Sequence, residues 1–391
     1  MTQTNTKIAD APNGVDFVAR AKEIAPIIAA AAPEIDANQR LTEGVLAALH
    51  KAEMFRMFVP RSLGGYELDP PTFAEVVETL AYSDASTAWI VSQCSICSMS
   101  VAYLPHETGK LIVGDDPNAI LAWGAMPNGQ ARREGDGWRI TGKWFFASGS
   151  RHATWMGGRC PLFTADGQPI LDDKGEPAVR MFLFPKSDVT VNTSWDVIGL
   201  RGTGSDGYQV TDLFVPDDRQ FDVNTKANQD GLVYRIVNRH LYGPGVAAIA
   251  LGVSRAVLDS FRTVAKDEKK GLKNSAAIQS ELGWAEARWR TARAGFYAAM
   301  REVWADIEAG GTETIDHEII VRSAATLAIH EAKAVVDFAF HEGGAATILN
   351  SLPFERRVRD MHAILQHGQS KRNNMEAVGR YHLGMEPGAV L

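Results

Sequence analysis

The chain has 391 residues, of which 45% are hydrophobic and 22% charged, the composition of an ordinary globular protein with room for two or three domains. Its formal net charge of -7 and its lack of a Lys/Arg block argue against nucleic-acid binding, because phosphates attract clustered cations. The first 14 residues are polar and show no apolar segment of signal-peptide length, so we expect a cytoplasmic protein.

The N-terminal third is predicted to be helical. Amphipathic runs cover Val15 to Ile24, Thr42 to Met54 and Pro71 to Tyr82, and the last begins with a proline suited to a first turn. Ala85 to Leu104 is more apolar, but its serines and its glutamine favour a buried helix over a membrane span. A short helix is expected from Pro105 to Val113.

The chain has three cysteines, an odd and small number that fits a reducing compartment. Cys94 and Cys97 form a C-x-x-C pair, but no second pair and no histidine stands at metal-ligand spacing. Together with Cys160 they are expected to lie in the core, and no metal site is predicted.

After Asp115 the pattern changes to short strand-like runs separated by Gly, Asp and Pro. The runs are Leu121 to Met126, Trp138 to Ser148, Met181 to Phe184, Val189 to Val191 and Tyr208 to Val215. They predict a central β-barrel or sandwich, with Asp166 to Pro177 as an exposed hairpin loop.

One strand-like run, Gly142 to Ser150, has a composition that suits a binding site. Trp144, Phe145 and Phe146 favour a strand, and the run ends in a small polar tail that includes Ser148. An aromatic wall ending in a hydroxyl and a glycine suits a flat, largely apolar cofactor such as a flavin ring. These residues alone favour an ordinary buried strand with a polar turn, because short apolar runs are ambiguous, and they leave the cofactor site as the alternative.

The last part of the chain is predicted to form a helical bundle, because its helical runs are long and nearly free of Pro and Gly. The runs are Val246 to Val264, Ser275 to Glu308, Ile315 to His341 and Phe354 to Arg380. The fold is therefore expected to be α+β, with an N-terminal helical domain at 1–118, a central β domain at 119–222 and a C-terminal bundle at 223–391.

This order of domains resembles the acyl-CoA dehydrogenase superfamily, and three motifs match it. Phe58 to Tyr66 is similar to a connector with a proline and two glycines. Thr141 to Gly149 is similar to the strand that contacts the flavin ring. Trp195 to Ser205, followed by Asp212 to Pro216, is similar to the second β motif. The resemblance covers almost the whole chain and implies a four-helix C-terminal bundle.

The catalytic base of the dehydrogenases has no counterpart here. Those enzymes use a glutamate to remove a proton from an acyl-CoA thioester. Gly368 occupies the usual position after Arg359 and Asp360, and no Asp or Glu lies between Asp230 and Asp259, where other members carry the base.

Two FAD-binding elements of the family also differ in this chain. The flavin loop is replaced by Ala122 to Gly129, and the element that holds the adenine end of FAD is replaced by Lys266 to Gly271. A permanently held FAD is therefore less expected.

His367 matches the active-site histidine of the two-component flavin monooxygenases, which are relatives of the dehydrogenases. The resemblance implies an oxygenase component that receives FMNH2 or FADH2 from a separate NAD(P)H:flavin reductase. With O2 it would form a C4a-hydroperoxyflavin and hydroxylate a small aromatic substrate. The alternative is an acyl-CoA dehydrogenase-type FAD flavoenzyme. A non-catalytic relative from the DNA-damage response would need a basic surface to bind nucleic acid, and the net charge of -7 argues against one.

The resemblance also implies roles for individual residues. Ser148 would bond the central-ring nitrogen of the flavin, and His367 would act as general base toward a phenol. A turn serine and a capping or core histidine are the plainer alternatives. Further cofactor contacts are expected from Phe146, Trp123, Ala125, Met126, Arg201, Thr203, Ser205, Gly343 and Gly344, and substrate contacts from Trp89 and His240. Arg201 could equally be a surface residue in a tight turn, and Gly343 could simply end a helix. Trp89 and His240 could be ordinary core residues. A homotetramer follows by analogy only.

Overall fold

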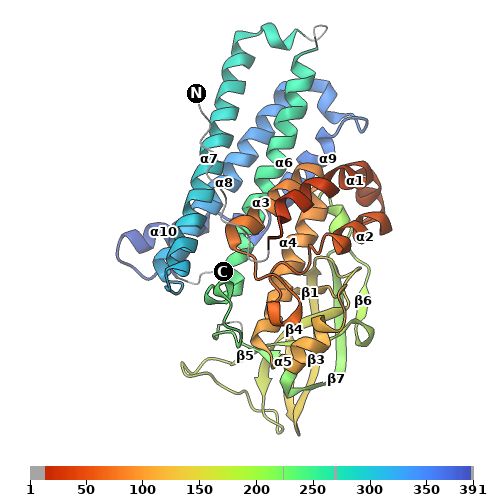
Figure 1. Cartoon of the computed structure of the whole chain (residues 1–391), viewed down its shortest axis with the longest axis vertical. Helices are drawn as coiled ribbons and strands as arrows, with labels where there is room; N and C mark the ends of the chain where they lie inside the picture. The colour runs from red at the N-terminus through yellow and green to blue at the C-terminus, as the bar shows by residue number, and fades with distance from the viewer. Residues whose placement is uncertain (1–13, 223, 268–270, 389–391) are drawn as a thin grey trace.

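The computed structural model describes residues 14–222, 224–267 and 271–388, and it places helices at both ends of the chain with a sheet between them (Figure 1). The N-terminal helices are α1 (Phe17–Asn38), α2 (Glu43–Lys51), α3 (Pro70–Ser83), α4 (Ala85–Met99) and α5 (His106–Gly109). The strands are β1 (Leu121–Gly124), β2 (Gly129–Glu134), β3 (Gly137–Ala147), β4 (Trp155–Phe163), β5 (Val179–Pro185), β6 (Thr190–Asn192), β7 (Asp206–Pro216) and β8 (Gln220–Phe221). The C-terminal helices are α6 (Tyr242–Ala265), α7 (Ala276–Glu308), α8 (Ile315–Glu342), α9 (Phe354–Ile364) and α10 (Asn373–His382). The predicted α+β fold class is confirmed.

Helix α1 is longer than its amphipathic run indicated. It begins after Asp16, whose carboxylate accepts a hydrogen bond from the Ala19 N–H at 2.8 Å, and continues to Asn38 through Pro26 and Pro33. A proline inside a helix removes a backbone donor and normally disrupts it. Here apolar residues on both sides of the prolines are buried and the helix packs against α3, so tertiary packing stabilises it.

Helix α4 is the predicted apolar helix, and it is buried on almost every face. Asp84 caps it by accepting a hydrogen bond from the Thr87 N–H at 2.7 Å, and the helix packs against α3, α6 and β1. Its Cys94 and Cys97 are buried, as is Cys160 in β4, and all three thiols are free. The predicted core position of the cysteines is confirmed.

A second apolar stretch, Asn238–Ala265, is long and apolar enough to cross a membrane by length and composition. In the described fold, 83% of its most apolar window is buried. The stretch includes α6, which packs against α3, α4, α8 and α9. This is the placement of a helix in the middle of a protein core.

The eight strands form one mixed sheet in the order β6-β7-β3-β2-β4-β5-β8, with β1 paired to β4. The predicted runs correspond to β1, β3, β5, β6 and β7, whereas β2, β4 and β8 are not among them. Two adjacent glycines and a proline weaken the strand pattern of β4. One of these glycines makes room for an aromatic ring, because a Cβ on Gly158 would lie 2.5 Å from the Trp144 side chain.

The C-terminal bundle rests on three long helices, α6, α7 and α8, which run side by side away from the sheet (Figure 1). The predicted segment from Phe354 to Arg380 is divided into α9 and α10 by a turn at 365–372. Helix α9 packs against α6 and α8, and α10 packs against α8. The turn between them carries His367 toward α4 and the end of β3.

Candidate active site

The end of β3 carries an exposed aromatic ring on a strained backbone. Between Trp144 and Ala147, β3 has one residue more than the facing segment of β7, so a bulge forms. Phe146 in this bulge has a φ of 62° and is 72% exposed. A left-handed backbone at a large apolar residue is unfavourable and is typical of functional sites. The ring meets Trp195 edge-on, with 6.0 Å between the centroids.

Ser148, just beyond the bulge, belongs to a row of linked side chains that we call the hydroxyl chain: Trp89, Ser148, Ser205 and Thr203. The Trp89 Nε1–H donates to Ser148 Oγ at 2.9 Å. Ser148 Oγ lies 2.8 Å from Ser205 Oγ, which lies 2.8 Å from Thr203 Oγ1. Thr203 and Ser205 are buried, whereas Ser148 is partly exposed. Three hydroxyl residues that the sequence indicated thus lie in one network, and Trp89 is its fourth member.

Leu200 anchors the buried end of the hydroxyl chain. Thr203 Oγ1–H donates to the Leu200 carbonyl at 2.8 Å, and the Leu200 N–H donates to Asp360 Oδ1 on α9 at 2.7 Å. Burial, and then the negative charge of Asp84, raises the pKa of Asp360 to about 7. Burial also raises the pKa of Asp84, which caps α4. The two carboxyl groups lie where α4, α9 and the turn at 199–205 meet.

His367 lies in the turn after α9, with its ring edge-on to Trp89 and 5.3 Å between the ring centroids. Its Nδ1 accepts a hydrogen bond from the Gln369 N–H at 3.3 Å. Burial, and then the positive charge of Lys371, lowers the pKa of His367 to about 4. The ring is therefore neutral at pH 7, and because Nδ1 is an acceptor, the ring proton is on Nε2. The ring thus offers a ligand a hydrogen-bond donor.

The turn that carries His367 is held by side chains from two further helices. Asn374 Nδ2 donates to the carbonyls of Gly368 and Gln369 at 3.2 and 2.9 Å. Arg322 Nη1 in turn donates to Asn374 Oδ1 at 3.3 Å. The position of His367 therefore depends on α8 and α10 as well as on α9.

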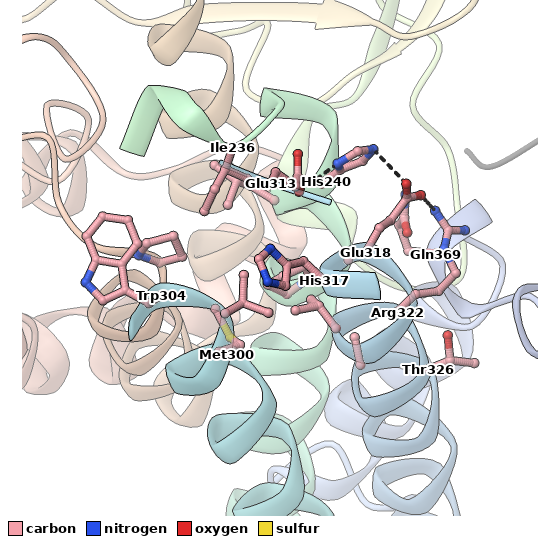
Figure 2. Close-up of a pocket in the computed structure, with 17 residues that line it drawn as sticks. Ile236, His240, Met300, Trp304, Glu313, His317, Glu318, Arg322, Thr326 and Gln369 are labelled. Carbon is pink, nitrogen blue, oxygen red and sulfur yellow. Dashed lines mark hydrogen bonds and ion pairs between the residues drawn. The ribbon is translucent and has the colours of Figure 1, made fainter. Parts of the chain in front are cut away.

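A cavity of about 50 Å³, which we call the His240 pocket, lies beside this turn between α6, α7 and α8 (Figure 2). Its walls are mainly apolar, and Gly243 and Gln369 are among them. The volume corresponds to roughly four water-sized groups, so the cavity suits the end of a ligand rather than a whole ring system.

Two glutamates, two histidines and one arginine line the His240 pocket. Figure 2 shows His240 between Glu313 and Glu318, with Nδ1 2.9 Å from Glu313 Oε1 and Nε2 3.6 Å from Glu318 Oε2. Neither ring nitrogen has a hydrogen bond of good geometry within the described part of the chain. Arg322 pairs with Glu318 at 2.9 Å, so two carboxylates outnumber one guanidinium.

Trp89 and His240, both expected near the substrate, lie in different parts of the site. Trp89 belongs to the hydroxyl chain and does not line the His240 pocket. Gln369 connects the two parts, because its side chain lines that pocket and its N–H donates to His367.

Arg201 and the glycine pair lie outside the hydroxyl chain. The Arg201 guanidinium donates to the carbonyls of Val197 and Asp36 at 2.9 and 3.3 Å, so the side chain lies against the end of α1. Gly343 and Gly344 lie at the C-terminal end of α8. Their expected contact with the cofactor stays a prediction.

The segment that replaces the family's flavin loop, Ala122 to Gly129, begins within β1 and lies at the bulge of β3. The backbone of Phe145 approaches Gly124 so closely that a Cβ there would overlap it. Beyond Gly124, Ala125 is exposed and Met126 is 63% exposed, whereas Trp123 is half-buried. Phe146 and Met126 thus add exposed apolar surface at the bulge, and the partly exposed Ser148 hydroxyl adds a polar group. That combination fits the edge and face of a flavin ring.

Several residues that hold the site together are absent from the predicted set: Leu200, Gln369, Asn374 and Asp360. Asp360 carries a signal in the sequence, because it lies beside Val358 and Met361 on the apolar stripe of α9. A carboxyl group on such a stripe is expected to have a buried partner.

Comparisons with known proteins agree with this architecture. The acyl-CoA dehydrogenase N-terminal domain matches residues 17–110, and the acyl-CoA dehydrogenase C-terminal domain matches residues 245–372. The indole-3-acetate monooxygenase of Pseudomonas putida is 28% identical over 359 residues, which cover 90% of each chain.

Two further similar proteins match over nearly the whole chain. The flavin-dependent monooxygenase oxygenase subunit HsaA of Rhodococcus jostii is 26% identical, over 88% of this chain and 92% of its own. The structure of XiaF from a Streptomyces species, solved with FADH2 and glycerol, superposes with a TM-score of 0.87 at 23% identity and covers 96% of each chain.

Proposed function

The chain belongs to the acyl-CoA dehydrogenase superfamily, and on that premise we propose that it is the oxygenase component of a two-component flavin-dependent monooxygenase acting on a small aromatic compound. The observation that carries the proposal is the partly exposed Ser148 of the hydroxyl chain, which lies beside the exposed Phe146 and near His367. Gly368 stands where the dehydrogenases have their base. A reduced flavin, FMNH2 or FADH2, would supply the electrons that activate O2 for insertion of one oxygen atom into the substrate.

The chain's own residues would hold the flavin in three ways. Phe146 and the exposed Met126 offer apolar surface to the ring. Ser148 offers a hydroxyl at its edge, and Thr203 and Ser205 keep that hydroxyl in place from the buried side. Because the site lies between α4, the sheet and the turn after α9, a ring bound there would be shielded from water on several sides.

His367 would contact the oxygen of the substrate. The general-base role that the resemblance implies needs a bare Nε2, whereas the bond from the Gln369 N–H to Nδ1 favours a proton on Nε2. In this arrangement His367 donates a hydrogen bond to a phenol or phenolate oxygen and stabilises negative charge there. It becomes a base only when the Gln369 contact is broken.

The His240 pocket would receive the part of the substrate farthest from the reacting carbon. Its excess of carboxylates disfavours a substrate carboxylate and favours a neutral hydrogen-bond donor or an amine. His240, whose ring nitrogens lack well-directed bonds, would gain one from such a group.

Reduced flavin would come from a separate NAD(P)H:flavin reductase, since the relative in Rhodococcus jostii is named an oxygenase subunit. The choice between FMN and FAD, the homotetramer and the cytoplasmic location stay predictions.

A direct test mixes the protein anaerobically with reduced FMN or FADH2 and then adds O2 with an aromatic compound. We expect the bound flavin to reoxidise more slowly than free flavin, and 18O from O2 to appear in a hydroxylated product. Reoxidation at the rate of free flavin would contradict the proposal. So would anaerobic bleaching of a tightly bound oxidised FAD by an acyl-CoA, which is the reaction of a dehydrogenase.

A further inference from the structure

We propose that Thr203 and Ser205 are positioning residues that give the hydroxyl chain a fixed direction, so that Ser148 meets the flavin as a hydrogen-bond acceptor. The preference for reduced over oxidised flavin, which is expected of an oxygenase component, would then depend on these two residues. The inference rests on the proposed function in one respect, namely that Ser148 meets the central ring of the flavin.

The two ends of the hydroxyl chain determine its direction. The Trp89 indole N–H can only donate, and the Leu200 carbonyl can only accept. Thr203 has one hydroxyl proton and uses it on that carbonyl, so its bond to Ser205 requires the Ser205 proton.

The same reasoning fixes the remaining link. Because the Ser205 hydroxyl donates its hydrogen bond to Thr203, it can only accept from Ser148. The bond between Ser205 and Ser148 therefore requires the Ser148 hydroxyl as the donor. All four bonds form together only if every hydroxyl donates toward Leu200. Ser148 then accepts from Trp89 and retains one lone pair for a ligand.

Burial makes this direction persistent. The Leu200 carbonyl also accepts hydrogen bonds from the Trp195 Nε1–H and the Thr203 N–H, each at 3.1 Å, so reversing the chain would not leave it without a donor. Reversal would instead leave the Thr203 hydroxyl oxygen and the Leu200 carbonyl oxygen 2.8 Å apart with no proton between them, at a position where Thr203 is 2% exposed and Ser205 is 5% exposed. The anchor is firm as well, since the Leu200 N–H donates to the buried Asp360.

A lone pair on Ser148 discriminates between the two states of a flavin. The central-ring nitrogen bonded to the oxygen-reacting carbon carries a hydrogen in the reduced form and a bare lone pair in the oxidised form. A hydrogen-bond acceptor binds the N–H of the reduced form and is repelled by the lone pair of the oxidised form. This polarity suits an oxygenase component that takes up reduced flavin and releases oxidised flavin.

The test measures dissociation constants of oxidised FMN, and of FMN reduced with dithionite under anaerobic conditions, for the full-length protein and four variants. The wild type is expected to bind reduced FMN at least about tenfold more tightly. Ser205→Ala and the isosteric Thr203→Val each release the Ser148 proton, so each should lower this preference by roughly five- to tenfold. Each tenfold change corresponds to about 30 mV in the midpoint potential of the bound flavin, which is an independent readout.

Two variants separate direction from mere structure. Trp89→Phe removes the donor end and leaves the Ser148 proton on Ser205, so the preference should stay within about twofold. Ser150→Ala is the matched control, because this buried serine donates to the Gly204 carbonyl and has no bond to the hydroxyl chain. Its preference should equal that of the wild type. Circular dichroism and melting temperatures establish that each variant is folded.

The outcomes are distinguishable. If the wild type binds neither form of FMN or FAD, the proposed function fails, and this inference fails with it. If the wild type prefers reduced flavin and Thr203→Val and Ser205→Ala keep that preference unchanged, the inference is overturned while the proposed function stands. Equal losses in Trp89→Phe and Thr203→Val would also overturn it.

Discussion

The hydroxyl chain and the ionisable residues of the His240 pocket are two polar groups of side chains connected through His367 and Gln369, and they differ in how well their hydrogen-bonding atoms are satisfied. In the hydroxyl chain every donor has one acceptor, and the last acceptor is a backbone carbonyl. In the His240 pocket a histidine lies between two carboxylates, and neither ring nitrogen has a well-directed hydrogen bond within the described residues.

This difference matches what each region would bind. A cofactor is the same in every turnover, so a rigid and fully bonded wall recognises it without reorganisation. A substrate brings its own polar group, and a buried group that lacks a good partner gains from meeting it. The satisfied region is therefore expected to tolerate substitution poorly, and the unsatisfied region to change specificity when it is altered.

The largest expected effect concerns His367, the residue between the two regions. His367→Ala should lower product formation by about 100-fold or more, because a positioned polar group is lost from the reacting centre. His367→Gln keeps an N–H donor and should retain roughly tenfold more activity than the alanine variant.

The pH dependence of wild-type activity separates the two roles of His367. Because its pKa is lowered to about 4, the ring stays neutral as the pH falls from 8 to 5, and product formation should show no decline near pH 6.5. Equal losses in the alanine and glutamine variants, or a clear decline near pH 6.5, would contradict the donor role.

Alanine substitutions at two glycines, one in each region, compare how much extra volume the two regions tolerate. Gly149 has a φ of +80°, and a Cβ there would lie 2.7 Å from Cys94 Sγ, so Gly149→Ala should destabilise the protein by about 2 kcal/mol. Gly243 lies in the first turn of α6, and a Cβ there would meet only the Gln369 side chain, whose Oε1 would lie 3.2 Å away. Gly243→Ala should change stability by less than about 0.5 kcal/mol. Melting temperatures measure both, and a larger loss at position 243 would refute the comparison.

A smaller effect is expected on specificity in the His240 pocket. With a neutral aromatic amide and the matching carboxylate as substrates, the wild type should show a KM about tenfold lower for the amide. Glu313→Gln keeps an acceptor for the Val237 N–H, bonded at 2.8 Å, but removes one charge, so the ratio should fall to about threefold.

The control for this substitution is Asp306→Asn. Asp306 is an exposed acid paired with His317, which lines the pocket, so the charge removed is similar but solvated. The KM ratio of this variant should equal that of the wild type. A wild type that prefers the carboxylate would refute the acidic-pocket argument.

Much of the fold could be predicted because its helices are long and its motifs are local. The runs that became α7 and α8 have few helix breakers, so their expected bounds are close to the observed ones. β4 could not be predicted, because glycine has a low strand propensity. Gly157 and Gly158 leave room for the rings of Trp123 and Trp144, which are distant in the sequence.

The site shows the same division between local and long-range information. The strand that ends in Ser148 has a local signature of aromatic residues followed by small polar ones. The partners of Ser148 come from positions 59 residues before it and 57 after it. No period or motif records which hydroxyls meet, and the direction of the chain follows only from the backbone group at its end.

The smallest expected effect concerns the anchor of the hydroxyl chain. The pKa of Asp360 is raised to about 7, above the usual value of about 3.9 for an unfolded chain, so the folded state holds a proton that the unfolded state has lost. The stability that this group contributes is full below about pH 4 and is lost as the pH rises through 7, with a slope of at most about 1.4 kcal/mol per pH unit. Asp360→Asn keeps an acceptor for the Leu200 N–H and removes the titration, so its melting temperature relative to wild type should rise between pH 5 and pH 7.5.

Asp360→Leu removes the acceptor as well and should be about 1 kcal/mol less stable than the asparagine variant at both pH values. If the wild type and Asp360→Asn respond to pH identically, the carboxyl group is not protonated in the folded protein, and the anchor of the chain is a charged one.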